Sequence, residues 1–173
     1  MIRKIIGSIC ILLATAGYGY QKGMVYQEEK EEVERLMRVI WQIKGEMSYT
    51  RSNLADVFAS VSDRIEEPYK SWTSTMAKHM NDRRESQLAD IWEQQTKEWL
   101  LNLNLPKEIK KELNDLGKKL NYLDISMQVQ SIEWFYERLK LLKKGIDNRL
   151  SEKRRLCNLL GVSGGIFLII LLF

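Results

Sequence analysis

The sequence predicts an all-α protein, a helical bundle of about six helices flanked by N- and C-terminal membrane segments. Between residues 27 and 155, apolar residues recur at spacings of three and four, which is the period of a helix with one buried face. At the two ends, Ile5–Tyr20 and Leu156–Phe173 are apolar runs without a charged residue, as in membrane-crossing helices. No stretch alternates apolar and polar residues in the way that a half-buried strand requires.

The composition fits one small folded domain between the apolar ends. The chain has 173 residues, enough for one domain, and its 29% of charged residues and two prolines are unlike a disordered protein. The 27 basic and 23 acidic residues give a net charge of +4, an excess too small and too dispersed to predict nucleic-acid binding. Cys10 and Cys157 lie one in each apolar run, so no disulfide framework is predicted.

Residues 1–26 form the first predicted membrane segment, and two interpretations fit it. Arg3 and Lys4 precede the apolar run and small residues stand near its end, as in a secretory signal peptide. The run also fits a transmembrane helix, because sixteen residues span roughly 24 Å and extension to Tyr26 approaches the ~30 Å hydrocarbon core. The sequence leaves both interpretations open.

Residues 156–173 form the second predicted membrane segment. Their eighteen residues span about 27 Å, close to the thickness of the hydrocarbon core. Three basic residues just before them are predicted to contact anionic lipid headgroups, namely Lys153, Arg154 and Arg155. Close packing of the two membrane helices is predicted at small residues, for which the candidates are Gly7, Gly17 and the GxxxG pair Gly161 and Gly165.

Two membrane segments place the whole middle domain on one side of the membrane. Near the membrane, the domain side carries more lysine and arginine than the outer ends, so the positive-inside rule favours a cytoplasmic domain. Arg3 and Lys4 argue for the opposite orientation, because the first helix often dominates. The prediction is a domain on the cytoplasmic side.

The middle domain, residues 27–155, is predicted to hold the six helices, joined by short connections. Capping residues and prolines mark their starts. The ranges are Glu28 to Tyr49, Ser52 or Asn53 to Val61, Pro68 to about Arg83, Glu85 to Leu101, Pro106 to about Leu120, and Leu123 or Asp124 onward into the last membrane segment. The apolar stripe of the last helix is Ile125, Val129, Ile132, Tyr136, Leu139, Leu142 and Ile146.

Five tryptophans lie in the middle domain, at positions 41, 72, 92, 99 and 134. They stand on or beside the apolar stripes, which predicts core packing for most of them. Tryptophan is also common among the residues that dominate protein interfaces. Trp72 is the one least aligned with a stripe, so it is the predicted partner-facing residue.

No catalytic, metal or cofactor site is predicted, and no small-molecule substrate. His79 is the single histidine, and no second histidine or cysteine accompanies it in a metal-binding spacing. The chain has no phosphate-binding glycine loop and no nucleophile motif. His79 is therefore expected at the surface near a helix end, and the chain is expected not to be an enzyme.

Two charged stretches have structural interpretations. The residues Glu31, Glu32, Glu34, Arg35 and Arg38 are expected on a solvated helix face with ion pairs one turn apart. The basic stretch from Lys140 to Arg155 abuts a membrane segment, so anionic lipid, rather than nucleic acid, is its predicted partner.

Four stretches of the chain also carry a family resemblance. They are Lys4–Gly7 with Leu12–Thr15 and Gly19; Ile43–Glu46 with Tyr49, Thr50 and Leu54; Leu116, Gly117, Leu120, Asp124 and Gln128; and Leu160–Val162 with Gly164, Gly165 and the Ile-Leu tail. In this order they resemble the stage III sporulation protein AB family of endospore-forming bacteria over nearly the whole length. The chain departs from it at Arg51, where the family usually has proline, and at Leu123, where glycine often precedes the aspartate.

The resemblance implies a fold and a function. It implies that the middle domain is similar to the helical F domain of type II secretion platforms. It also implies a subunit of the channel complex that joins mother cell and forespore, in the mother-cell membrane that faces the forespore. Its expected partners are other stage III sporulation A-operon proteins, especially the ATPase-like AA component. The alternative is a membrane-anchored helical scaffold or binding module unrelated to a channel.

Overall fold

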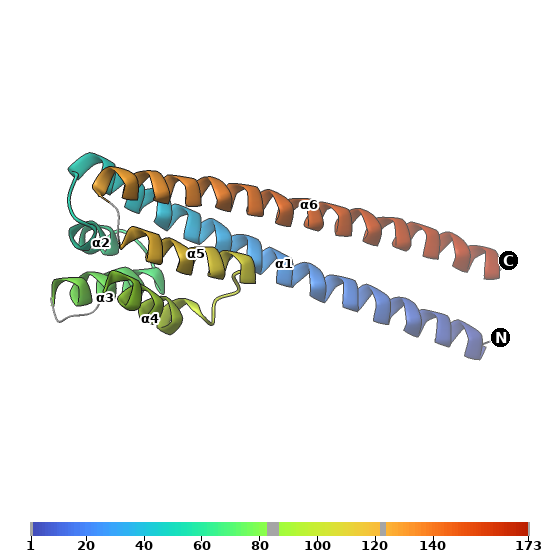
Figure 1. Cartoon of the computed structure of the whole chain (residues 1–173). Coiled ribbons are helices and arrows are strands. Elements are labelled where there is room, and N and C mark those ends of the chain that lie inside the picture. The colour runs from blue at the N-terminus through green and yellow to red at the C-terminus, as the bar shows by residue number, and fades with distance from the viewer. Residues whose placement is uncertain (1, 83–86, 122–123, 173) are drawn as a thin grey trace. The chain divides into compact units, whose positions relative to one another are not determined.

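The chain folds into helices joined by short turns (Figure 1). The computed structural model describes the backbone of residues 2–82, 87–121 and 124–172, and the side chains of residues 26–82, 87–121, 124–152 and 155–156. Over those residues it has six helices and no strand: α1 (Ile2–Thr50), α2 (Leu54–Ser62), α3 (Tyr69–Asn81), α4 (Leu88–Leu100), α5 (Lys107–Leu120) and α6 (Ile125–Leu172). The predicted all-α class is confirmed.

The helices divide between two units. The helical unit, residues 31–143, contains α2 to α5 and the adjoining parts of α1 and α6. The terminal unit, residues 1–30 and 144–173, contains the outer parts of α1 and α6, where Lys30 Nζ and Asp147 Oδ1 form an ion pair at 2.8 Å. The predicted domain limits at residues 26 and 156 remain predictions.

The membrane segments predicted at residues 1–26 and 156–173 lie almost entirely outside the described side chains. Within the part of the chain that is described, no helix combines the length and the apolar character needed to cross a membrane.

Local sequence explains where the helices begin. Asn53 caps α2, because its Oδ1 accepts a hydrogen bond from the backbone N–H of Asp56 at 3.0 Å. Asp124 does the same before α6, where its Oδ1 accepts from the backbone N–H of Met127 at 2.8 Å. Pro68 and Pro106 stand immediately before α3 and α5, where a missing N–H costs no helical hydrogen bond.

The ends of α3 and α4 differ from the predicted ranges. α3 ends at Asn81 and α4 begins at Leu88, each a few residues inside the predicted limit. Gln87 has an extended backbone, with φ −66° and ψ 147°, which places the start of α4 at the next residue.

The predicted apolar stripes form most of the core of the helical unit. The stripe residues of α1 and α5 are all buried, namely Val33, Leu36, Ile40, Ile43, Met47, Ile109, Leu113, Leu116 and Leu120. The stripe predicted for the last helix, now α6, is less completely buried. Ile132 and Leu139 are buried, but Ile125, the first residue of the helix, is exposed, and Phe135, which the predicted stripe omits, is buried instead.

Three aromatic side chains from successive helices form the centre of this core. Phe58 of α2 and Trp72 of α3 have ring centroids 5.9 Å apart, and Trp92 of α4 lies 5.9 Å from Phe58 and 5.4 Å from Trp72. The Trp92 indole N–H donates to the backbone oxygen of Leu113 in α5 at 2.9 Å. Gly117 of α5 lies against the Trp92 ring so closely that an added Cβ would overlap it. Glycine is therefore required for α5 to approach α4.

The expectation that Trp72 faces a partner is wrong. Its side chain is fully buried in this aromatic cluster, and its indole N–H donates to Thr96 Oγ1 at 3.3 Å. Thr73, its neighbour, is buried too, and its hydroxyl donates to the backbone oxygen of Tyr69 at 3.0 Å. The buried face of α3 thus includes a threonine, which a stripe drawn through apolar residues alone does not reach.

In the helical unit, α1 and α6 run antiparallel and are held by ion pairs (Figure 1). Lys44 pairs with Glu133 at 2.6 Å, and Glu34 pairs with Lys143 at 2.8 Å. From the first pair to the second, the residue number falls by ten on α1 and rises by ten on α6. Both pairs are therefore consistent with a single alignment of the two antiparallel helices. On the other flank of α6, Arg138 binds Glu108 and Glu112 of α5 at 3.0 and 2.9 Å.

Candidate interaction surface

The described residues contain no group of three or more metal-ligating side chains. His79 is exposed in the last turn of α3, where the sequence placed it. The features that remain for a function are polar networks between helices and apolar side chains at the surface.

One polar network is buried between α1 and α3. Glu32 is 5% exposed, and its Oε1 accepts the Tyr69 hydroxyl at 2.8 Å while its Oε2 contacts Arg35 at 3.3 Å. The expectation that Glu32 lies on a solvated face is wrong, because Tyr69 at the start of α3 covers it. Burial, together with the nearby Glu32 carboxylate, raises the pKa of the Tyr69 hydroxyl far above its usual value. Tyr69 is therefore a neutral donor.

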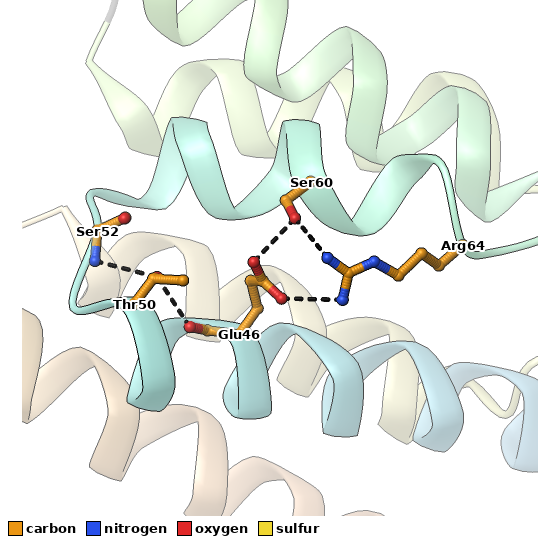
Figure 2. A network of polar contacts seen from close by, with 5 residues as sticks. All are labelled: Glu46, Thr50, Ser52, Ser60 and Arg64. Carbon is orange, nitrogen blue, oxygen red and sulfur yellow. Dashed lines mark hydrogen bonds and ion pairs between the residues drawn. The ribbon is translucent and has the colours of Figure 1, made fainter.

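A second network joins the end of α1 to α2, and Figure 2 shows its members. Glu46 Oε1 accepts the Ser60 hydroxyl at 2.8 Å, and Glu46 Oε2 pairs with Arg64 at 3.0 Å. The Thr50 hydroxyl donates to the backbone oxygen of Glu46 at 2.9 Å and accepts from the Ser52 N–H at 3.2 Å. Glu46 and Thr50, two residues of the sequence motif, thus hold the turn between these helices.

Tyr49, another residue of this motif, lies just before the turn, and its side chain faces the solvent. Tyr49 is 90% exposed, the most exposed large apolar side chain among the described residues. Arg51, in the turn, has a left-handed backbone with φ 50°, and its N–H bonds to the backbone oxygen of Met47 at 3.1 Å.

Among the described side chains, three exposed apolar residues are aligned on α6. Met127, Trp134 and Leu141 are 50, 68 and 63% exposed. They are seven residues apart, so they lie on one face of the helix within about 20° per step. We call these three residues the α6 stripe.

A groove of about 670 Å³ runs beside the α6 stripe, between α5 and α6. Met127 and Trp134 line it, and Leu116 and Phe135 contribute apolar walls. Its charged lining includes Arg138, which is already paired with the α5 glutamates. The groove therefore combines apolar walls with charged residues, next to an exposed tryptophan.

A second exposed tryptophan lies on α1. Trp41 is 60% exposed and lines a smaller groove of about 370 Å³ between α1 and α6, together with Glu34, Met37, Arg38, Tyr136 and Lys143. Arg38 is exposed and has no ion-pair partner among the side chains that the structure describes. Tryptophan and arginine side by side are the residue types most enriched at interface hot spots.

Sequence reasoning missed both surface tryptophans as candidates. The signal for the α6 stripe was present, because Met127, Trp134 and Leu141 recur every seven residues beside the stripe that was recognised. Trp41 follows directly on the buried Ile40, so its orientation could be read from the register of the α1 stripe.

Among the residues predicted to contact lipid or to pack in the membrane, only Arg155 has a described side chain. Arg155 is exposed on α6. The remaining candidates for lipid contact and helix packing have side chains outside the described residues, namely Gly7, Gly17, Lys153, Arg154, Gly161 and Gly165.

Comparisons with known proteins agree with the resemblance in the sequence. Residues 4–173 match the family described as stage III sporulation protein AB. The chain is 21% identical over 169 residues to stage III sporulation protein AB of Bacillus subtilis (strain 168), which covers 98% of both chains. A solved structure of a stage III sporulation protein AB superposes with a TM-score of 0.62 at 18% identity, over 72% of this chain and 97% of that one. The structural similarity shows a shared fold.

Proposed function

The chain belongs to the stage III sporulation protein AB family, and from this we propose that it is a non-enzymatic membrane platform subunit of the sporulation channel complex, which links mother cell and forespore. The observation that carries the proposal is the family match, because it extends from residue 4 to residue 173 and so includes both predicted membrane segments as well as the helical unit.

The proposed task of the helical unit is to dock a secretion-type ATPase, the AA component, among its operon partners. A non-enzymatic docking role is supported by the arrangement of the polar groups. Two hydrogen bonds join neighbouring helices, one between Tyr69 and Glu32 and one between Ser60 and Glu46. The polar atoms of these side chains therefore stabilise the fold. The surface that is left for a partner includes the groove around Trp41.

We place the ATPase contact at Trp41 and Arg38 on α1. An exposed indole offers a large apolar area at low conformational cost, and an unpaired guanidinium can bind a partner carboxylate with two hydrogen bonds. Trp41 thus takes the role that the sequence had predicted for Trp72.

In this proposal the chain is anchored in the mother-cell membrane that faces the forespore, with the helical unit in the cytoplasm, where an ATPase can reach it. Lys153, Arg154 and Arg155 then lie at the level of the lipid headgroups. Gly7, Gly17, Gly161 and Gly165 then lie within the paired membrane helices.

Co-purification of the ATPase-like component from sporulating cells tests the docking. Full-length chain with Trp41→Ala should retain at least tenfold less of it than the wild type. Leu101→Ala is the matched control, since Leu101 is 53% exposed and apolar but lies just past the end of α4, away from Trp41 in the sequence and outside both proposed contact surfaces. Equal retention of the ATPase-like component by the wild type and by Trp41→Ala would show that the contact lies elsewhere on the chain. No retention by the wild type, or normal sporulation after deletion of the gene, would favour a scaffold unrelated to the channel.

The side of the membrane is tested with a single cysteine. Ser74 is exposed on α3, and the described side chains of the helical unit include no cysteine. A Ser74→Cys chain with Cys10 and Cys157 replaced by serine should resist an impermeant thiol reagent until the cells are permeabilised. Labelling in intact cells would exclude contact with a cytoplasmic ATPase.

A further inference from the structure

We propose that the α6 stripe binds a second copy of this chain, with the two α6 helices parallel and Met127, Trp134 and Leu141 each facing its own counterpart. The direction of the pairing depends on the membrane anchoring proposed above. The surface itself is a property of the helical unit.

The spacing of the stripe is that of a helix–helix seam. Three apolar side chains at seven-residue intervals extend over fourteen residues, or about 21 Å of helix. A coiled-coil seam repeats two apolar positions per heptad, and the stripe supplies one of them; slight supercoiling keeps these three side chains in line toward a partner helix. An irregular partner surface would require no such repeat.

The exposure of the stripe is typical of a surface that a partner covers. Single apolar side chains at a protein surface are ordinary, but here three large ones, each at least half exposed, are aligned on one helix face. The other face of α6 carries the buried residues Ile132, Phe135 and Leu139, so the fold of the helical unit is already satisfied without the stripe.

The charges around the stripe favour a copy of the same chain. Identical surfaces carry identical charges and repel each other unless those charges are compensated within each copy. On α6 several of these charges are compensated, because Glu133, Glu137, Arg138 and Lys143 each form an ion pair within the chain. Lys140, the partner of Glu137, also lies 4.7 Å from the centroid of the Tyr136 ring. The stripe can thus meet its own copy with these charges already paired within each chain.

The direction of α6 selects the parallel arrangement. α6 is one helix from Ile125 to Leu172, and its C-terminal part is the proposed membrane anchor. Two copies anchored in one membrane have the same ends of α6 at the membrane, so equal residue numbers face each other. The groove between α5 and α6, with its Leu116 and Phe135 walls, then offers space beside Trp134 for the indole of the second copy.

Cysteine cross-linking of the full-length chain in membranes of sporulating cells tests the pairing. Three chains with Cys10 and Cys157 replaced by serine carry one cysteine each, as Met127→Cys, Trp134→Cys or Leu141→Cys. On oxidation each should form a disulfide-linked species of twice the chain mass. Leu101→Cys is the matched control, since Leu101 is 53% exposed and apolar but lies just past the end of α4. It should give at least tenfold less of the dimer.

The pattern of products decides the proposal. A dimer at position 134 alone would show antiparallel helices and overturn the parallel arrangement. Adducts of another mass would show that a different protein covers the stripe. The absence of any product at all three positions would also overturn the proposal. As a further test, Trp134→Glu is added to the chain that carries Met127→Cys. This change should reduce the amount of disulfide-linked dimer at least tenfold, whereas adding Leu101→Glu should not.

This experiment is independent of the proposed ATPase docking, because it reports a contact between two copies on α6 and the docking test uses Trp41 on α1. A dimer without ATPase retention would leave the pairing intact and overturn only the docking.

Discussion

The centre of the helical unit and its α1–α6 surface use the same side chain in opposite ways. Trp72 and Trp92 lie at most 1% exposed in the centre of α2 to α5, with their indole N–H groups bonded to other helices. Trp41 and Trp134 are 60 and 68% exposed on α1 and α6. Burial makes the first two part of the fold, and exposure makes the other two available to partners. Residue type alone therefore does not separate structural from functional tryptophans.

The largest expected effect comes from truncating one tryptophan of each kind. Trp92→Ala should lower the free energy of unfolding by about 3–5 kcal/mol, because it removes a buried indole and leaves a cavity. Trp134→Ala should change it by less than about 0.5 kcal/mol. Chemical denaturation of the detergent-purified chain, followed by circular dichroism, measures both. Similar losses in the two variants would mean that Trp134 is part of the fold.

A smaller effect is expected at Gly117, where the core is tightest. Gly117→Ala should destabilise the fold by about 1–3 kcal/mol, because the added methyl group overlaps the Trp92 ring. Gly45→Ala on α1 is the matched control. An added Cβ there meets nothing within 4 Å, so alanine should stabilise the helix by about 0.5–1 kcal/mol. Opposite signs in thermal denaturation would support the tight packing, whereas stabilisation by both would contradict it.

Alkaline pH should act on the buried centre through Tyr69. Its pKa is raised in the folded chain above the ordinary value of 10.0, so above that pH the unfolded chain loses this proton while the folded chain keeps it. The free energy of unfolding should therefore fall as pH rises beyond 10, and Tyr69→Phe should weaken that dependence. Denaturation curves between pH 8 and about pH 11 measure the slope. An unchanged slope in Tyr69→Phe would assign the dependence to other groups.

The smallest effect is expected at a helix end on the surface. Asn53→Ala removes the side chain that caps α2 and should cost about 1 kcal/mol. Asn53→Ser keeps an acceptor for the Asp56 N–H without placing a carboxylate against the Asp56 side chain, and should cost less. Thermal denaturation distinguishes the two, and equal melting temperatures would show that the cap contributes nothing.

The sequence was sufficient to predict the helices, because they depend on local signals. The period of the α1 and α5 stripes, the cap at Asn53 and the prolines before α3 and α5 all act within a few residues. The least accurate limits are those of α3 and α4, which carry mixed polar and apolar faces. Phe135 was missed because its burial depends on how α5 packs against α6, which no local pattern specifies.

The candidate surface was harder to predict than the fold. Trp72 was misassigned because the face of α3 that includes the buried Thr73 is not purely apolar. The burial of Glu32 depends on Tyr69, thirty-seven residues away in the chain, so it is a tertiary effect. The membrane segments, the domain limits and the ATPase docking remain predictions.

The ion pairs between α1 and α6 have a consequence for how the protein is made. Glu34 and Lys44 belong to the first helix that the ribosome releases, whereas their partners Lys143 and Glu133 belong to the last. Nascent chains fold as they are synthesised, from the N-terminal side. Here the first helix can contact α2 and α3 early, through pairs such as Glu46–Ser60 and Glu32–Tyr69, but its contacts with α6 form only when synthesis is almost complete. A truncated chain that lacks α6 should therefore be a substrate for proteases.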